Sequence, residues 1–285
     1  MPLGIGVVMH LYPLCALRCV PLPWWSVGNF RRMLLLRAID RDSLILANAG
    51  SERAAGAHTP VTLSRTRHGV RVDGTYEYMS LAHEADIVLF CAPLTDSRTL
   101  FCAAGLHGDS VRIGAPKFSG SMQHSDTCPV TFTNHHVPSH RYIEIPGESA
   151  LNCMAQYQRS WFQLLLGESY LARIEYLQGQ WNLPRPVEQL ASLNELDRLR
   201  EYALRLLDEA AAPGAIESLA RVTAAMKLRI SWHAQSIAAA LRGVDEESAR
   251  ELGFLRLQPT SDERILRSIS PGSRAATHPA AAQAP

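Results

Sequence analysis

One carboxylate and one histidine pair stand out as candidates for chemistry in this chain. Glu168 lies in an otherwise apolar stretch, Leu164–Leu171, where burial would raise its pKa toward that of a general base. The same glutamate could equally be a structural residue of a helix, paired with Arg173 or with a backbone group. His135 and His136 are adjacent, so on a strand they point to opposite faces and cannot bind one ion together. We interpret both as surface or loop residues.

The cysteines do not form a recognisable framework. Their spacing contains no CxxC pair, which argues against a zinc ribbon or a disulfide scaffold and indicates a reducing, cytoplasmic setting. Two of them, Cys15 and Cys19, are most simply core residues. The sequence therefore predicts no metal site.

Composition excludes several classes of function. The chain has 285 residues, 47% of them hydrophobic, which is enough to bury a substantial core. A net charge of +1 provides no strong field for nucleic acid or for an anionic membrane, so we expect neither as a partner. Any binding must come from local sites.

The first 23 residues are apolar but do not resemble a targeting signal. No basic segment follows Met1, and polar residues and prolines interrupt the run: His10, Tyr12, Pro13, Arg18 and Pro21. We expect a buried helix here, whose packing partners lie upstream in relatives or in another subunit.

Hydrophobic spacing divides the chain into helical, β and helical parts. Helix-like spacing covers 3–20 and 29–40, the second with Asn29 as a plausible N-cap. From Ser43, short β-type runs follow between turn residues: Leu44–Leu46, Val61–Leu63, Val70–Val72, Ile87–Phe90 and Val130–Phe132. Helical spacing returns after Gly147, over about 152–178, 187–211 and 214–242, with a shorter stretch near 260–268.

These elements predict an α+β fold. Residues 1–42 form a remnant of an N-terminal helical domain, and 43–147 form a small β-barrel or sandwich domain. A four-helix bundle follows over 148–272. The Ala/Pro-rich end, 273–285, is expected to be a disordered tail.

Three segments in a fixed order carry a resemblance to a known family. Gly69–Phe90 has a β-hairpin that leads into Tyr78-Met-Ser80 and then an Ala-Asp pair before an apolar strand. Leu46–Gly56 is similar to a Thr-Glu-Pro-Gly-x-Gly loop, and Phe118–Tyr142 has a Ser run, a strand and a Val-Pro. Through these segments the chain resembles the acyl-CoA dehydrogenase flavoproteins. Further matching residues extend the resemblance from about residue 5 to 279: Lys227, Glu263, Arg264, Arg267 and His278-Pro279.

The resemblance implies a cofactor and a site. It implies FAD, with FMN as an alternative, packed on Tyr78 and hydrogen-bonded near its reactive edge by Ser80, because a flat ring system needs an apolar face and a donor at its edge. It also implies that loop amides cradle the flavin and phosphate oxygens at Gly50, Ser51, Glu52 and Gly56. The implied substrate is an acyl thioester on CoA or a carrier protein, and the implied assembly is a homodimer or homotetramer.

The chain also departs from the family pattern. The dehydrogenases need a catalytic glutamate, and neither family position holds one: the C-terminal turn after Arg267 lacks a carboxylate, and the position early in the first bundle helix falls near Trp161 and Phe162. Glu168 is the nearest downstream acid. Arg267 followed by His278 resembles the histidine ending of flavin monooxygenase relatives, which makes His278 a second catalytic candidate.

Two further departures concern completeness. The cross-subunit Arg-x-x-Phe-Gly flavin contact is replaced by Gln180–Pro184, and the chain is expected to start without most of the family's N-terminal helical domain. Three hypotheses follow. The chain is a flavin-dependent oxidoreductase of acyl thioesters, a catalytically inert partner subunit or remnant of this fold, or a flavin-dependent monooxygenase.

Overall fold

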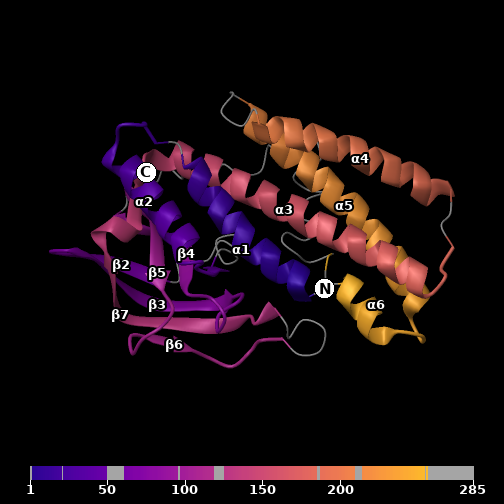
Figure 1. Ribbon diagram of the computed structural model, residues 1–285, viewed down its shortest axis with the longest axis horizontal. Coiled ribbons are helices and arrows are strands. Elements are labelled where there is room, and N and C mark those ends of the chain that lie inside the picture. The colour runs from indigo at the N-terminus through magenta and orange to yellow at the C-terminus, as the bar shows by residue number, and fades with distance from the viewer. Residues whose placement is uncertain are drawn as a thin grey trace, which may run out of the picture.

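The structure is a computed structural model, and it describes residues 2–20, 22–49, 61–95, 97–118, 125–184, 187–208, 214–253 and 255. Within these residues the chain is an α+β protein with six α-helices and two four-stranded sheets. Figure 1 shows the strands on one side and the long helices α3, α4 and α5 on the other, with α1 running between them.

The elements follow the helix, strand, helix order that the sequence predicts. The helices are α1 (Pro2–Cys19), α2 (Val27–Arg41), α3 (Gly147–Gln180), α4 (Val187–Asp208), α5 (Ala215–Leu241) and α6 (Glu246–Gly253). The strands are β1 (Leu46–Asn48), β2 (Val61–Thr66), β3 (Gly69–Met79), β4 (Ile87–Thr95), β5 (Arg98–Gly105), β6 (Val111–Ile113), β7 (Cys128–Pro138) and β8 (Tyr142–Ile145). A single 3₁₀ turn, Ser139–Arg141, separates β7 from β8. The helix expected near 260–268 lies outside the described residues.

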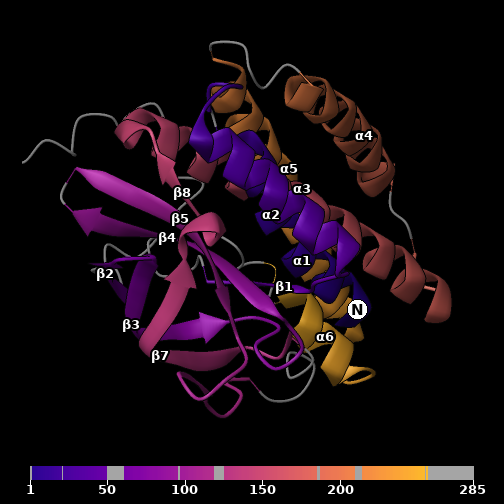
Figure 2. The ribbon, with the colours of Figure 1, turned by 60° about the vertical axis from the view of Figure 1, so that its left-hand side comes forward.

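The two sheets pack face to face. Sheet A has the strand order β1-β4-β5-β8 and sheet B the order β2-β3-β7-β6; β1 runs parallel to β4, and the other pairs are antiparallel. Aromatic rings fill the space between the sheets, where the Phe90 centroid lies 5.5 Å from that of Tyr76 and 6.3 Å from that of Phe132. Figure 2 shows sheet B on the outer side, away from the helices.

Both faces of sheet A are buried. Val88 and Phe90 of β4 point toward sheet B, whereas Ile87 and Leu89 point toward the helices. This explains why β4 is a continuous apolar run rather than an alternating one. The helix-facing side packs against α1, α2 and the start of α3 through these residues: Ala16, Leu17, Leu35, Ile39, Phe101, Ile143, Ile145 and Met154.

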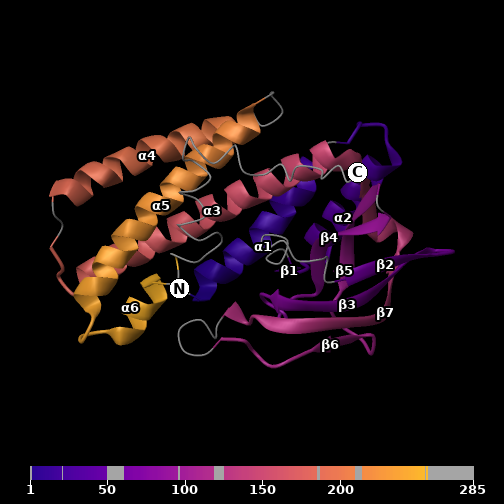
Figure 3. The same ribbon diagram turned by 180° about the vertical axis from the view of Figure 1, so that it is seen from behind.

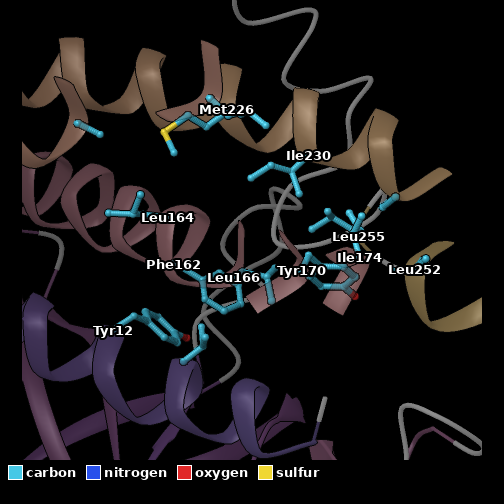
Figure 4. Close-up of a cluster of buried hydrophobic side chains, with 14 of the residues drawn as sticks. Tyr12, Phe162, Leu164, Leu166, Tyr170, Ile174, Met226, Ile230, Leu252 and Leu255 are labelled. Carbon is cyan, nitrogen blue, oxygen red and sulfur yellow. The ribbon is translucent and has the colours of Figure 1, made fainter. Parts of the chain in front are cut away.

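A second core joins the helices. Figure 4 shows side chains of α3, α5 and α6 converging, with Tyr12 of α1 entering beside Phe162 and Leu166. The ring centroids of Tyr12 and Phe162 lie 4.7 Å apart. Ile230 of α5 and Tyr170 of α3 are buried in the same cluster.

Helix α1 takes part in both cores, and this corrects one expectation. It has packing partners within the chain, on α3 and on sheet A, where the sequence predicted partners upstream or in another subunit. A proline inside a helix costs about 3 kcal/mol, and α1 contains Pro13. Burying a large apolar side chain contributes about 1.5–3 kcal/mol, and Val8, Tyr12 and Leu17 are all buried, so packing outweighs the proline.

The start of α2 also differs from the prediction. Ser26 is the N-cap, and its hydroxyl accepts a hydrogen bond of 3.0 Å from the backbone N–H of Asn29. Asn29 lies inside the helix, where its side chain donates to the Trp24 carbonyl. Around this turn Trp24, Trp25 and Phe30 are exposed. No helix in the described part of the chain is both long and apolar enough to cross a membrane.

A buried ion pair holds α6 against α3. Arg173 donates from Nε to Glu251 at 3.1 Å and from Nη2 to Ser248 at 3.1 Å, and the Tyr170 hydroxyl donates to the Glu251 carbonyl. Only 8% of the Glu251 side chain is exposed. Removing the arginine would therefore leave a carboxylate in the core without this cation.

We expect Arg173→Met to lower the free energy of unfolding by about 3–5 kcal/mol, the usual cost of breaking one half of a buried ion pair. The double variant Arg173→Met/Glu251→Leu should recover most of this loss, because an apolar pair of similar size leaves no buried charge. Urea unfolding measures both. A double variant as unstable as the single one would contradict this account.

A histidine connects α1 to sheet A in a way that depends on pH. Nδ1 of His10 accepts a hydrogen bond of 3.1 Å from the backbone N–H of Leu46, which only an unprotonated nitrogen can do. Burial lowers the pKa of His10 below its usual value of 6.5. Below about pH 6.5 the unfolded chain therefore binds a proton more readily than the folded one.

Stability from His10 is thus fully present above about pH 7 and is lost as the pH falls below about 6.5. We expect His10→Asn, which keeps a side-chain acceptor, to unfold with a smaller loss between pH 7.5 and 5.5 than the wild type. His140→Asn, at an exposed histidine, is the control and should keep the wild-type pH dependence. Equal pH dependence for the two variants would rule out the His10 contact as its source.

Candidate functional site

The β3 strand ends in a bulge that changes the direction of its last side chains. Tyr76 pairs with Val130 and Met79 with Cys128, so β3 carries one residue more than β7 between these pairs. Strict alternation from Tyr76 would bury Tyr78, but the extra residue places Met79 in the core instead. Tyr78 is consequently 46% exposed. Bulges of this kind are common beside active sites.

Two neighbours hold the Tyr78 ring. The Phe118 ring stacks on it with centroids 6.4 Å apart, and Lys117 Nζ lies 5.6 Å from its centroid. Lys117 is itself fixed, since Nζ contacts Glu77 at 2.8 Å and its backbone N–H donates to the Thr127 carbonyl. The result is an aromatic platform whose tyrosine still exposes nearly half of its surface.

A line of three hydroxyls leads from this platform into the protein. The Ser80 hydroxyl lies 3.0 Å from that of Thr127, which lies 2.8 Å from that of Ser125. Thr127 and Ser125 are buried, and Ser80 is partly exposed. If Ser125 donates to Thr127 and Thr127 donates to Ser80, the Ser80 proton is free for a ligand. Sequence reasoning found Ser80 but missed both partners, which are more than forty residues away.

Two strained residues fix the corner where these hydroxyls lie. Leu81 and Asp126 have φ values of 60° and 45°, a left-handed conformation that costs a non-glycine residue about 1 kcal/mol or more. Backbone bonds join the two turns: Leu81 N–H donates to the Ser125 carbonyl and Ala82 N–H to the Asp126 carbonyl, at 3.0 and 3.1 Å. Two backbone hydrogen bonds thus hold the two turns of the corner together.

Several residues predicted from the sequence cannot be compared with these. The proposed phosphate-binding loop, with Gly50, Ser51, Glu52 and Gly56, lies outside the described residues. The same is true of His278. Their roles stay predictions.

Glu168 lies on a different part of the molecule from Tyr78 and Ser80. Its Oε2 is 3.5 Å from Arg200 on α4, and its Oε1 is buried with no hydrogen-bond partner. Arg173, the partner considered from the sequence, pairs with Glu251 instead. Figures 1 and 3 both show α4 on the far side of α3 from the sheets. The structure therefore does not bring Glu168 to the corner that holds Tyr78 and Ser80.

The adjacent histidines of β7 lie on opposite faces, but one of them is not a surface residue. His135 is buried, with Nδ1 2.8 Å from the Ser110 hydroxyl, whereas His136 is exposed. Burial and the neighbouring charges of His136 and Arg141 lower the pKa of His135. The contact between His135 and Ser110 has the geometry of a structural hydrogen bond.

Comparison with known proteins gives a fold and no family assignment. No family model matches the chain, and no curated protein matches significantly. Solved structures do match. The prolyl acyl carrier protein oxidase AnaB covers 94% of this chain and 77% of its own, with a TM-score of 0.69 at 14% identity.

Two further structures agree with this match. The dibenzothiophene monooxygenase TdsC from Paenibacillus sp. A11-2 covers 93% of this chain and 77% of its own, with a TM-score of 0.67 at 15% identity; TdsC has also been solved with FMN bound. Apo-form PigA covers 94% and 76%, with a TM-score of 0.64 at 17% identity. Identities this low establish the fold alone. The chain has the acyl-CoA dehydrogenase fold that these enzymes share.

Proposed function

We propose that the protein is a flavin-dependent oxidoreductase that binds its flavin at the corner formed by Tyr78 and Ser80. The observation that carries the proposal is the bulge in β3, which takes Tyr78 out of the core and leaves it beside a serine hydroxyl. An exposed aromatic ring with an adjacent hydroxyl suits a flat, apolar ring system with polar edges. The shared fold with an FMN-bound enzyme supports the same choice of cofactor.

The corner offers the two groups that a flavin ring system needs, an aromatic face and a hydrogen-bond donor at its edge. A bound flavin supplies a two-electron acceptor. Tyr78 would pack against the ring system, held by Phe118 and Lys117, and Ser80 would donate to its polar edge, with Thr127 and Ser125 setting the direction of that hydrogen bond. Both FAD and FMN present this ring system. We propose that the loop amides of Gly50, Ser51, Glu52 and Gly56 bind the phosphates.

We propose an acyl thioester as the substrate, carried by CoA or by a carrier protein, and a homodimer or homotetramer as the assembly. The resemblance of the sequence to acyl-CoA dehydrogenases supports the thioester, and AnaB, named as an oxidase of a prolyl acyl carrier protein, supports a carrier-bound form. A flavin monooxygenase is the second candidate. TdsC, named as a dibenzothiophene monooxygenase, has the same fold, which favours this alternative.

The flavin proposal predicts which variants lose the cofactor. We expect Tyr78→Ala to weaken binding of FMN and FAD by about tenfold, because stacking of aromatic rings contributes about 0.5–1.5 kcal/mol beyond area burial. Ser80→Ala should weaken it by about two- to tenfold, the loss of one hydrogen bond. Tyr78→Phe should bind like the wild type. Flavin fluorescence titrations measure all three.

Tyr176→Ala is the matched control, since Tyr176 is an exposed tyrosine on α3. It should leave the affinity for flavin unchanged.

A wild-type protein that neither co-purifies with flavin nor takes it up would remove both enzyme hypotheses and leave the inert partner subunit. If flavin binds, its bleaching by acyl thioesters without oxygen identifies a dehydrogenase or oxidase. A monooxygenase would instead need externally reduced flavin and oxygen.

For Glu168 the structure favours the interpretation as a structural residue, because its carboxylate meets Arg200 across α3 and α4. We expect Glu168→Gln to leave the rate of flavin reduction within about twofold and to lower stability by under about 1 kcal/mol, as for a partly exposed ion pair. Stopped-flow absorbance measures the rate. Glu175→Gln, at an exposed glutamate of the same helix, is the control. Loss of reduction in Glu168→Gln alone, with flavin still bound, would establish the glutamate as the base.

A further inference from the structure

Three potential metal ligands meet behind the corner that holds Ser80. They are Nδ1 of His83, Oδ1 of Asp126 and Sγ of Cys128, and all three atoms lie within 4.8 Å of one another. Nδ1 is 2.7 Å from Oδ1 and 3.7 Å from Sγ, and Sγ is 3.5 Å from Oδ1. Among the residues that the structure describes, no other group of His, Cys, Asp and Glu side chains converges in this way.

The distances suit one tetrahedral ion. Zinc binds nitrogen and oxygen at about 2.0–2.2 Å and thiolate sulfur at about 2.3 Å, so tetrahedral ligands lie roughly 3.3–3.6 Å apart. The two distances that involve Sγ are close to this value. The third is shorter because His83 and Asp126 share a hydrogen bond, which an ion would replace. A rotation of the exposed His83 ring accommodates that change.

The backbone prepares the group for binding. Asp126 and Cys128 are two residues apart at the start of β7, and Asp126 has the left-handed φ of 45°. Its other oxygen, Oδ2, accepts a hydrogen bond of 2.5 Å from the backbone N–H of His83, which holds the two turns together. A carboxylate whose second oxygen accepts a hydrogen bond in this way is typical of metal sites.

The group is also accessible from one side. Cys128 is fully buried, whereas 49% of the His83 side chain and 19% of the Asp126 side chain are exposed. An ion could enter past His83 and keep water as its fourth ligand. A catalytic cysteine does not fit, because burial and the Asp126 carboxylate raise the pKa of Cys128 to about 11 and keep the thiol protonated.

We propose that His83, Asp126 and Cys128 form a mononuclear site for a divalent transition metal, with zinc as the expected ion. The combination of imidazole, carboxylate and thiolate with one open position is a donor set that zinc accepts. On binding, the Cys128 thiol loses its proton to solvent and sulfur bonds to the ion. The sequence did not reveal the site because His83 lies 43 residues before Asp126.

The proposed metal site is separate from the proposed flavin site, but both lie on the same backbone segment at the start of β7. Thr127, between the ligands Asp126 and Cys128, holds the Ser80 hydroxyl. The proposal does not depend on flavin binding, and its test uses flavin-free protein. A failure of one proposal therefore leaves the other standing.

The test uses the reduced, metal-free full-length chain and adds Zn²⁺ or Co²⁺. We expect one Zn²⁺ to bind per chain with release of a proton, measured by calorimetry in buffers of different ionisation enthalpy. Co²⁺ should give the intense visible bands of a tetrahedral site together with a thiolate charge-transfer band. Cys128→Ser should abolish that band. It should also raise the Kd for Zn²⁺ by more than about 100-fold, since losing even a residue that only hydrogen-bonds to a metal ligand costs about 10–100-fold in affinity.

Matched variants separate this site from adventitious binding. His83→Gln and Asp126→Asn should weaken Zn²⁺ binding to a similar degree, and Asn tolerates the left-handed backbone at 126. Cys153→Ser and His107→Gln are the controls, because Cys153 is a partly buried cysteine of α3 and His107, like His83, faces an aspartate, Asp86 at 3.7 Å. Both should bind Zn²⁺ like the wild type.

Either of two results would overturn the proposal. One is Zn²⁺ binding that is absent in the wild type or unchanged in Cys128→Ser. The other is a Co²⁺ spectrum of the wild type without a thiolate band. The second measurement needs no variant, so it stands even if a substitution prevents folding. In either case the His83–Asp126 contact would be only a structural hydrogen bond between two turns.

Discussion

The burial of α1 between the helices and sheet A is the constraint on which the rest of the structure depends. Its first half contributes Val8 and Tyr12 to the helical core, and its second half contributes Ala16 and Leu17 to the core against sheet A. Two opposite parts of the helix are thus buried, whereas Val7 and Arg18 remain exposed. Because one rigid element belongs to both cores, the helices cannot shift relative to the sheets without exposing apolar surface on one side.

That constraint determines where a ligand can bind. With both faces of sheet A buried, the surfaces left to sheet B are its outer face and the ends of its strands. The corner after β3 lies at such an end, and the bulge there exposes Tyr78 beside Ser80. The left-handed backbone at Leu81 and Asp126 is tolerated because several hydrogen bonds around the corner stabilise the same conformation.

Much of the element order could be predicted from the sequence, because helix and strand periods are local. The spacing predicted α1, α3, α4, α5 and the apolar parts of β3, β4 and β7. It missed β5, whose Cys-Ala-Ala-Gly segment has low strand propensity and is held by pairing with β4 and β8. It also missed α6, which is short and is held to α3 by the Arg173–Glu251 pair.

The candidate site also contains residues that the sequence could predict and residues that it could not. Tyr78 and Ser80 were predictable because motif order along the chain survives low sequence similarity. Their partners were not, since Thr127 and Phe118 meet them only through the pairing of β3 with β7 and the loop before it. The packing of α1 within the chain depended in the same way on contacts with α3 that no local pattern contains.

The parallel pairing of β1 with β4 has a consequence for the order of folding. Ile45 beside β1 and Asp86 before β4 are 41 residues apart, and they exchange hydrogen bonds in both directions. The β4–β5 hairpin can form locally, but β1 must close a long loop to reach its edge, which is slow. Helices α1 and α2 precede β1 directly and should dock with it in a late, cooperative step. The first 49 residues are then the last segment to fold, and their docking completes both the helical core and the core against sheet A.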